Sequence, residues 1–98
     1  MKFMVTWQVH QGKLEEAYTL FSAMTPEQDA ADRGSVKQIG RWHDVVRGRG
    51  VTLCESDSAA AVANWCLNWS GLLDLDIAPV LDDDETRALG KARQQSSS

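Results

Sequence analysis

The chain has 98 residues, of which 43% are hydrophobic and 24% charged, and this length allows one compact domain but not two. It carries 10 Lys and Arg against 14 Asp and Glu, so its formal net charge is -4. Surfaces that neutralise nucleic-acid phosphates or anionic lipids need a basic excess, so neither nucleic acid nor membrane is expected as a partner. No apolar run approaches the ~18 residues of a membrane span. We expect a cytoplasmic protein.

The two cysteines are too few and too unpatterned for a disulfide framework or a zinc site. Cys54 and Cys66 are therefore interpreted as reduced, small apolar residues.

Residues 2–10 form the first predicted strand, because apolar and other side chains alternate along it with a period of two. Apolar side chains then recur at helical spacing and predict a helix over residues 13–24. Pro26 disfavours the α conformation in the residue before it, so this helix ends there. Residues 26–33 have no long apolar stripe, and we interpret them as a short helical turn or a loop that ends at Gly34.

Residues 36–43 and 51–55 are the second and third predicted strands. They are expected to pair antiparallel through a hairpin at residues 44–50. We attribute Gly48 and Gly50 in this hairpin to a need for positive φ angles.

An alanine-rich segment predicts the next helix, which Asp57 or Ser58 would cap. Residues 72–81 form a fourth predicted strand, in which Pro79 favours an edge position because it has no N–H to donate to a neighbour. A last, short helix is expected where the run of acidic residues begins at Asp82.

The order strand, helix, strand, strand, helix, strand predicts an α+β domain of the ferredoxin-like βαββαβ type over residues 1–93, followed by a disordered tail at 94–98. This topology places two helices on one face of a four-stranded antiparallel sheet, with the second and fourth strands at its edges. The open face must therefore meet water, a ligand or another subunit.

The alternation along each strand predicts which side chains line this open face. Placing the apolar Phe3, Leu53 and Leu75 under the helices turns their strand neighbours outward. The second strand is ambiguous; with Gly40 and Trp42 under the helices, its other residues join the open face. The candidate residues that would line a cavity on this face are Thr6, Gln8, His10, Arg41, His43, Cys54, Asp74 and Asp76.

Several segments resemble a widespread bacterial family known only as a domain of unknown function. They are residues 1–7 (MKFMVTW), residues 39–43 (IGRWH), Glu55, residues 65–74 and Pro79-Val80. The resemblance covers about residues 1–85. That family is similar in fold to the dimeric α/β barrel superfamily, so the resemblance implies a homodimer whose two sheets face each other around a cavity. It implies no reaction, since relatives of this fold include cofactor-free monooxygenases, isomerases and ligand-sensing domains.

Arg41 and His43 lie two residues apart on one predicted strand, so both are expected on one face, where His10, Asp74 and Asp76 would join them. One interpretation makes His43 a general base or a ligand-binding group, because an imidazole exchanges protons near neutral pH. The other, which occurs more often, places Arg41 in an ion pair with a carboxylate at the dimer interface and makes His43 its neighbour.

Trp65 and Trp69 are four residues apart on a predicted helix, where they either stack on a flat ligand or, more commonly, belong to the core. Two histidines and scattered acids do not form a spaced ligand set, so no metal or cofactor is expected.

The leading hypothesis is a homodimeric barrel that binds a small organic ligand between its two sheets, with cofactor-independent monooxygenation or isomerisation as the candidate activity. The alternative is a non-catalytic structural or regulatory dimerisation module. The sequence assigns no catalytic residue and leaves open whether the protein is an enzyme.

Overall fold

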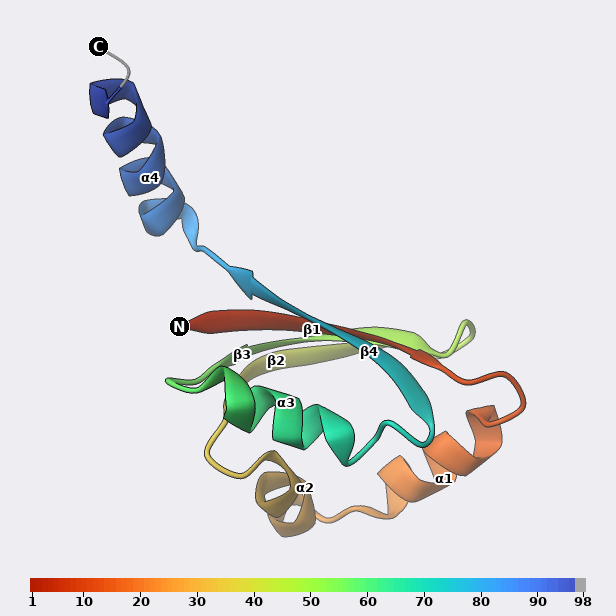
Figure 1. Cartoon of the computed structure of the whole chain (residues 1–98). Coiled ribbons are helices and arrows are strands. Elements are labelled where there is room, and N and C mark those ends of the chain that lie inside the picture. The colour runs from red at the N-terminus through yellow and green to blue at the C-terminus, as the bar shows by residue number, and fades with distance from the viewer. Residues whose placement is uncertain (97–98) are drawn as a thin grey trace.

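The computed structural model describes residues 1–96 and contains four strands and four helices. In chain order these are β1 (Lys2–Val9), α1 (Leu14–Ala23), α2 (Pro26–Arg33), β2 (Lys37–Asp44), β3 (Arg49–Glu55), α3 (Ala59–Leu67), β4 (Leu73–Val80) and α4 (Asp83–Ser96). Helices α1, α2 and α3 lie on the same side of the sheet, whereas α4 projects away from it (Figure 1). This projection makes the molecule elongated, with extents of 56 × 27 × 19 Å.

The four strands form one antiparallel sheet in the order β2-β3-β1-β4. This α+β architecture is compatible with a ferredoxin-like arrangement, and β2 and β4 occupy the edges, as predicted. Pro79 lies on the edge strand β4, which has a neighbouring strand on one side only. Proline is tolerated at such an edge because a strand there has fewer hydrogen bonds to donate.

The core lies between the inner face of the sheet and α3. It consists of Phe3, Val5, Val36, Cys54, Val62, Trp65 and Cys66. In β1 the predicted alternation is confirmed, because Phe3, Val5 and Val9 are buried. Trp65 is 7% exposed, which confirms its assignment to the core.

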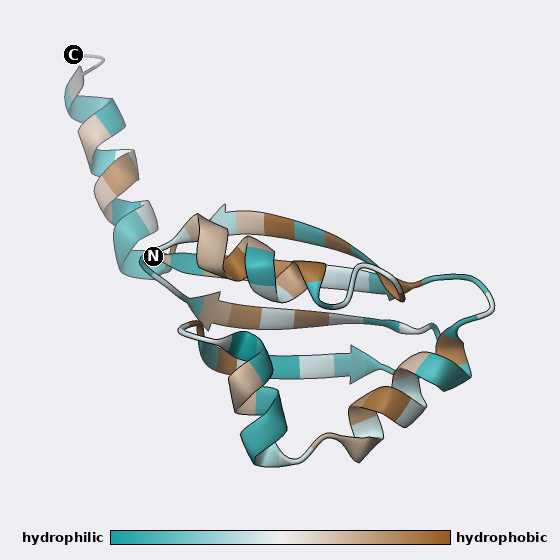
Figure 2. Ribbon diagram, turned by 60° about the horizontal axis from the view of Figure 1, so that its bottom comes forward, coloured by the Kyte–Doolittle hydropathy of each residue, from teal (hydrophilic) through white to brown (hydrophobic). Residues whose placement is uncertain are grey.

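Helix α2 is a complete eight-residue helix rather than the expected turn or loop. The Thr25 hydroxyl accepts a hydrogen bond from the Gln28 N–H, the Gln28 side chain accepts one from the Thr25 N–H, and Pro26 occupies the first turn. Gly34, with φ +63°, ends the helix as predicted. None of its residues is buried, and its surface is mostly hydrophilic (Figure 2). Apolar packing therefore does not hold α2 in place.

Two other expectations differ from the structure. In the hairpin Gly48 has φ +65°, but Gly50 does not have a positive φ, so that explanation of Gly50 is wrong. Helix α4 is longer than the predicted short helix and continues through residues 94–96, where a disordered tail was expected; residues 97–98 lie outside the described part of the chain. Among residues 1–96, no helix is both long enough and apolar enough to cross a membrane.

Candidate functional site

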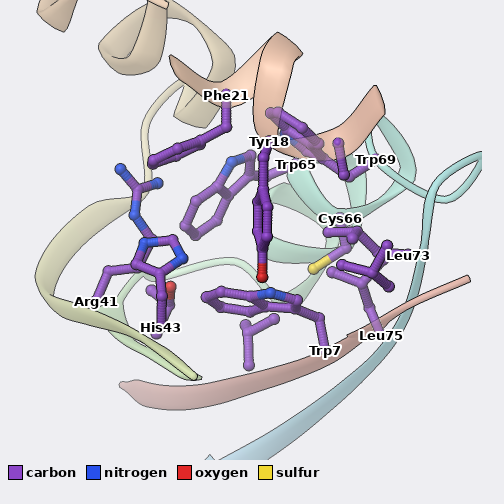
Figure 3. A pocket seen from close by; sticks show the side chains of 14 residues that line it. Trp7, Tyr18, Phe21, Arg41, His43, Trp65, Cys66, Trp69, Leu73 and Leu75 are labelled. Carbon is purple, nitrogen blue, oxygen red and sulfur yellow. The ribbon is translucent and has the colours of Figure 1, made fainter. Parts of the chain in front are cut away.

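A pocket lies between the inner face of the sheet and helices α1 and α3, and it is partly open to solvent (Figure 3). Its lining residues are Val5, Trp7, Val9, Ala17, Tyr18, Phe21, Arg41, His43, Thr52, Trp65, Cys66, Trp69, Leu73 and Leu75. The pocket exists because α1 buries only one side chain, the small Ala17, and so leaves space above the sheet. The cavity volume is about 80 Å³, several times the ~10–15 Å³ that one water molecule needs.

Aromatic rings surround the side of the pocket nearest to β2. The ring centroid of His43 lies 5.0 Å from that of Phe21 and 5.5 Å from that of Trp7. Phe21 is also 6.5 Å from Trp69, and all three pairs are inclined rather than parallel. Inclined rings expose both faces and edges, which are the surfaces on which a planar ligand packs.

Gly50 allows this aromatic wall to form. In the sheet register Gly50 of β3 lies between Trp7 of β1 and His43 of β2. A Cβ atom at Gly50 would overlap the Trp7 indole and would lie 2.6 Å from the backbone oxygen of Trp42. Glycine is therefore required here so that the indole can lie across β3 and meet the imidazole.

Arg41, at the mouth of the pocket, is held by an acid from α2. Its Nη2 lies 2.8 Å from Asp29 Oδ2 and its Nη1 lies 3.2 Å from Asp29 Oδ1. Arg33 Nη1 donates to the same Oδ2 at 2.8 Å, and the Arg41 guanidinium lies 4.7 Å from the centroid of the Phe21 ring. Two guanidinium groups thus share one carboxylate, and of these three groups only the Arg41 guanidinium lines the pocket.

The pKa of Asp29 reflects this pairing. Burial alone would raise the pKa, but the hydrogen bonds and charges of Arg41 and Arg33 together outweigh burial and lower it below the usual 3.8. A carboxyl whose folded-state pKa is depressed contributes stability above its unfolded-state pKa, and this contribution is lost as the pH falls through the folded-state value.

We therefore expect the substitution Asp29→Asn to lower the free energy of unfolding by about 1–2 kcal/mol at neutral pH. The difference from the wild type should shrink as the pH falls from about 4 towards about 2, because Asp29 then becomes neutral in the wild type as well. Urea unfolding curves of both proteins across this range measure the difference. A gap that stays constant down to the lowest pH would contradict this account of Asp29.

The imidazole of His43 is neutral at physiological pH. Burial lowers its pKa below the usual 6.5, and the charge of Arg41 lowers it further. The ring has contacts with Trp7 and Phe21, yet within residues 1–96 neither ring nitrogen is seen to make a hydrogen bond. A neutral imidazole offers one donor and one acceptor nitrogen, so both are available to a ligand.

A second acid of α2 orients the tryptophans behind the pocket. Asp32 Oδ2 accepts hydrogen bonds from the indole nitrogens of Trp65 at 3.0 Å and Trp69 at 2.7 Å. Its Oδ1 accepts one from Asn68 Nδ2 at 2.9 Å. Together with Asp29, these bonds explain how a helix without a buried residue stays on the body of the domain.

Tyr18 ties α1 to the hairpin between β2 and β3, because its hydroxyl donates a hydrogen bond to the carbonyl of Val45 at 2.7 Å. Cys66 lies deeper in the pocket wall. Burial, with a smaller contribution from Cys54, raises the pKa of its thiol to about 11. The thiol is therefore protonated at neutral pH and contributes packing rather than a nucleophile.

A family model described as "Domain of unknown function (DUF3303)" matches residues 1–94. The chain belongs to this family. A search of the curated proteins found no match.

In this DUF3303 domain, part of the predicted open face is as expected. Thr6, Gln8, Asp74 and Asp76 share that face in the register of β1 with β4. His10 Nε2 lies 2.9 Å from Asp74 Oδ1, which brings together two of the predicted residues. Whether these side chains line a cavity stays a prediction, since that cavity needs a second sheet.

The predicted placement of Arg41, His43 and Cys54 on the open face is wrong. All three lie on the inner face, as does Thr52, which is 1% exposed. Cys54 pairs with Phe3 across the sheet, and directly paired residues point to the same side. The error arose because β3 carries apolar side chains on both of its faces.

The opposite error affects Leu53, Gly40 and Trp42, which were expected under the helices. Leu53 pairs with Met4 on the open face, and Trp42 is 61% exposed there, with its ring over Gly40. A register irregularity between Gln38 and Gly40 shifts the side-chain alternation of β2. Arg41 therefore pairs with Asp29 of its own chain instead of with a carboxylate at an interface.

Sequence reasoning did not single out Phe21, Tyr18, Asp29 or Asp32 as site residues. One signal was present in the sequence: Thr25-Pro26-Glu27-Gln28 is a capping box with proline in the first turn, which predicts a helix start. A helix at this position would have placed the two acids on α2.

Proposed function

We propose that this domain binds a small organic molecule with a single planar ring in the pocket between α1, α3 and the inner face of the sheet. The observation that carries the proposal is the aromatic wall of Trp7, Phe21 and Trp69, open to solvent and bordered by Arg41 and His43. Ligand sites are typically apolar concavities in which a few polar groups fix the orientation of the ligand. The cavity of about 80 Å³ is smaller than the roughly 150 Å³ cavity that holds benzene elsewhere, so we expect one ring at most, with part of it in the open mouth of the pocket.

The sequence predicts cofactor-independent monooxygenation or isomerisation for a cavity between two sheets, and we propose this pocket as the site for either reaction instead. The neutral imidazole of His43 is the group that would accept a proton in either reaction. Binding does not depend on it, and binding is therefore tested first.

The test uses 4-fluorotoluene, a single ring whose bound fraction can be followed by ¹⁹F NMR. We expect the wild type to bind it and Trp69→Ala to bind it roughly 3- to 10-fold more weakly, because an aromatic wall is lost. Trp42→Ala is the matched control, since it removes the same kind of side chain from the opposite face. Equal weakening by the two substitutions, or no binding by the wild type, would reject the proposal.

We also propose that two copies associate through the open face of the sheet. This candidate is supported by the exposed apolar side chains Met4, 40% exposed, and Trp42, together with Leu53 paired to Met4. Clustered exposed apolar residues are typical of interaction surfaces. A dimer of this kind would serve either a ligand-binding protein or a non-catalytic dimerisation module.

For the dimer we expect Trp42→Glu to shift the protein from a twofold to a single molar mass in sedimentation equilibrium. A buried unpaired carboxylate at the centre of the interface costs more than the contacts there contribute. Leu89→Glu, on the projecting helix α4, is the control and should leave the mass unchanged. A wild type that sediments as a monomer would contradict the dimer proposal.

A further inference from the structure

The strongest feature not yet explained is the polar corner of the pocket, where His43 and Arg41 meet the aromatic wall. This inference rests on the proposed function: we infer that the ring accepted by the pocket carries a hydroxyl group, a phenol or an enol, which donates a hydrogen bond to His43 beside Arg41. The interaction is one of binding, and no covalent bond forms or breaks.

The first step of the argument is that His43, which is exposed to solvent, has an acceptor nitrogen that no protein group uses. Its imidazole is neutral, and within the described residues 1–96 its nitrogens have no hydrogen-bond partner. The nearby Tyr18 hydroxyl does not fill this role, because it donates to Val45. A ligand that brings its own O–H donor satisfies a group which a purely apolar ligand would cover without pairing.

The second step concerns charge. The charged groups near the pocket's polar corner are Arg41, Arg33, Asp29 and Asp32, whose charges balance, but of these four only Arg41 lines the pocket. His43 and Cys66 also belong to the wall, and both are neutral at neutral pH, because burial lowers the pKa of the imidazole and raises that of the thiol to about 11. The Arg41 guanidinium in the wall disfavours an amine, which becomes a cation, and accepts beside it a hydroxyl, whose oxygen carries partial negative charge.

The third step compares a hydroxyl with a carboxylate. Asp29 takes the edge of the Arg41 guanidinium that its two terminal nitrogens form, which leaves only the edge that includes Nε for a second carboxylate. A carboxylate also has no hydrogen to donate to the acceptor nitrogen of His43. A hydroxyl fits this corner better, because it needs no edge of the guanidinium and carries the donor that the acceptor nitrogen of His43 lacks.

The test compares 4-fluorophenol with 4-fluorotoluene, which differ only by O–H in place of CH₃, in ¹⁹F NMR titrations of the whole chain. We expect the wild type to bind the phenol at least as tightly as the toluene, although the toluene is the more apolar of the two. His43→Phe keeps a ring between Trp7 and Phe21 but removes both nitrogens. It should lower the affinity for the phenol relative to the toluene by roughly 3- to 10-fold.

Tighter binding of the toluene by the wild type would overturn the inference and leave the proposed function standing, and this result needs no variant that might fail to fold. An unchanged affinity ratio in a folded His43→Phe protein would also overturn it. His43→Gln, whose amide oxygen can accept the same bond, should restore most of the ratio. If neither compound binds, the proposed function itself is rejected, and the inference with it.

Discussion

Replacing Asp32 with alanine is expected to lower the free energy of unfolding by about 2–4 kcal/mol. The carboxylate accepts hydrogen bonds from the indoles of Trp65 and Trp69 and from Asn68, and alanine leaves all three donors without this acceptor. Because Trp65 belongs to the buried core, its donor cannot turn to water without opening the packing. Urea unfolding followed by tryptophan fluorescence measures the loss.

Two controls make the Asp32 experiment specific. Asp32→Asn keeps one acceptor oxygen for the indoles and should be clearly less destabilising than alanine. Asp57→Ala removes an exposed acid from the loop before α3 and should change stability by less than about 0.5 kcal/mol. Amide hydrogen exchange distinguishes loss of this anchor from a general loosening of the domain. Loss of the anchor predicts faster exchange throughout α2 in Asp32→Ala. A loss no larger than that of Asp57→Ala would show that Asp32 does not hold α2.

Replacing Gly50 with alanine is expected to destabilise the domain by about 1–3 kcal/mol and to abolish binding of a ring in the pocket. Alanine normally stabilises a strand relative to glycine, so the sign of this effect is diagnostic. It arises because the added Cβ overlaps the Trp7 indole and lies 2.6 Å from the backbone oxygen of Trp42, which cannot move away freely. The displaced indole then leaves the aromatic wall.

Gly71→Ala is the matched control for Gly50→Ala, because a Cβ at Gly71 meets nothing within 4 Å. We expect thermal unfolding to shift downward only for Gly50→Ala. The near-ultraviolet circular dichroism of the tryptophans should also change only in that variant. A Gly50→Ala protein as stable as the wild type would mean that the Trp7 indole can repack at no cost.

The fold was largely predictable because its pattern depends on apolar periodicity. Strand β1 alternates with a buried Phe3 and Val5, and the stripe that contains Val62 and Trp65 marks α3. Helix α2 was not predicted as a helix because it has no such stripe. Instead, Asp29 and Asp32 hold α2 through hydrogen bonds to Arg41 and Trp69. These partners are distant in sequence, and the periodicity of apolar residues does not reveal such pairs.

The site was less predictable than the fold because it depends on which face each edge residue occupies. A one-residue shift reverses every side chain of a strand, and the irregularity after Gln38 does this to Arg41 and His43. The apolar Trp42 favoured the wrong assignment, because a large exposed aromatic residue on a free sheet face looks in the sequence like a core residue. Conversely, the inner face buries Thr52, which looks like a surface residue.

The position of a bound ring relative to the tryptophans tests the central claim most directly. The four indole N–H groups of the chain give separate signals in a ¹H–¹⁵N spectrum, and aromatic rings shift nearby signals strongly. On titration with 4-fluorotoluene we predict large shifts for Trp7 and Trp69 and none for Trp42, which lies on the opposite face. Shifts confined to Trp42, or the absence of any shift at saturating ligand, would contradict a ligand site beneath the helices.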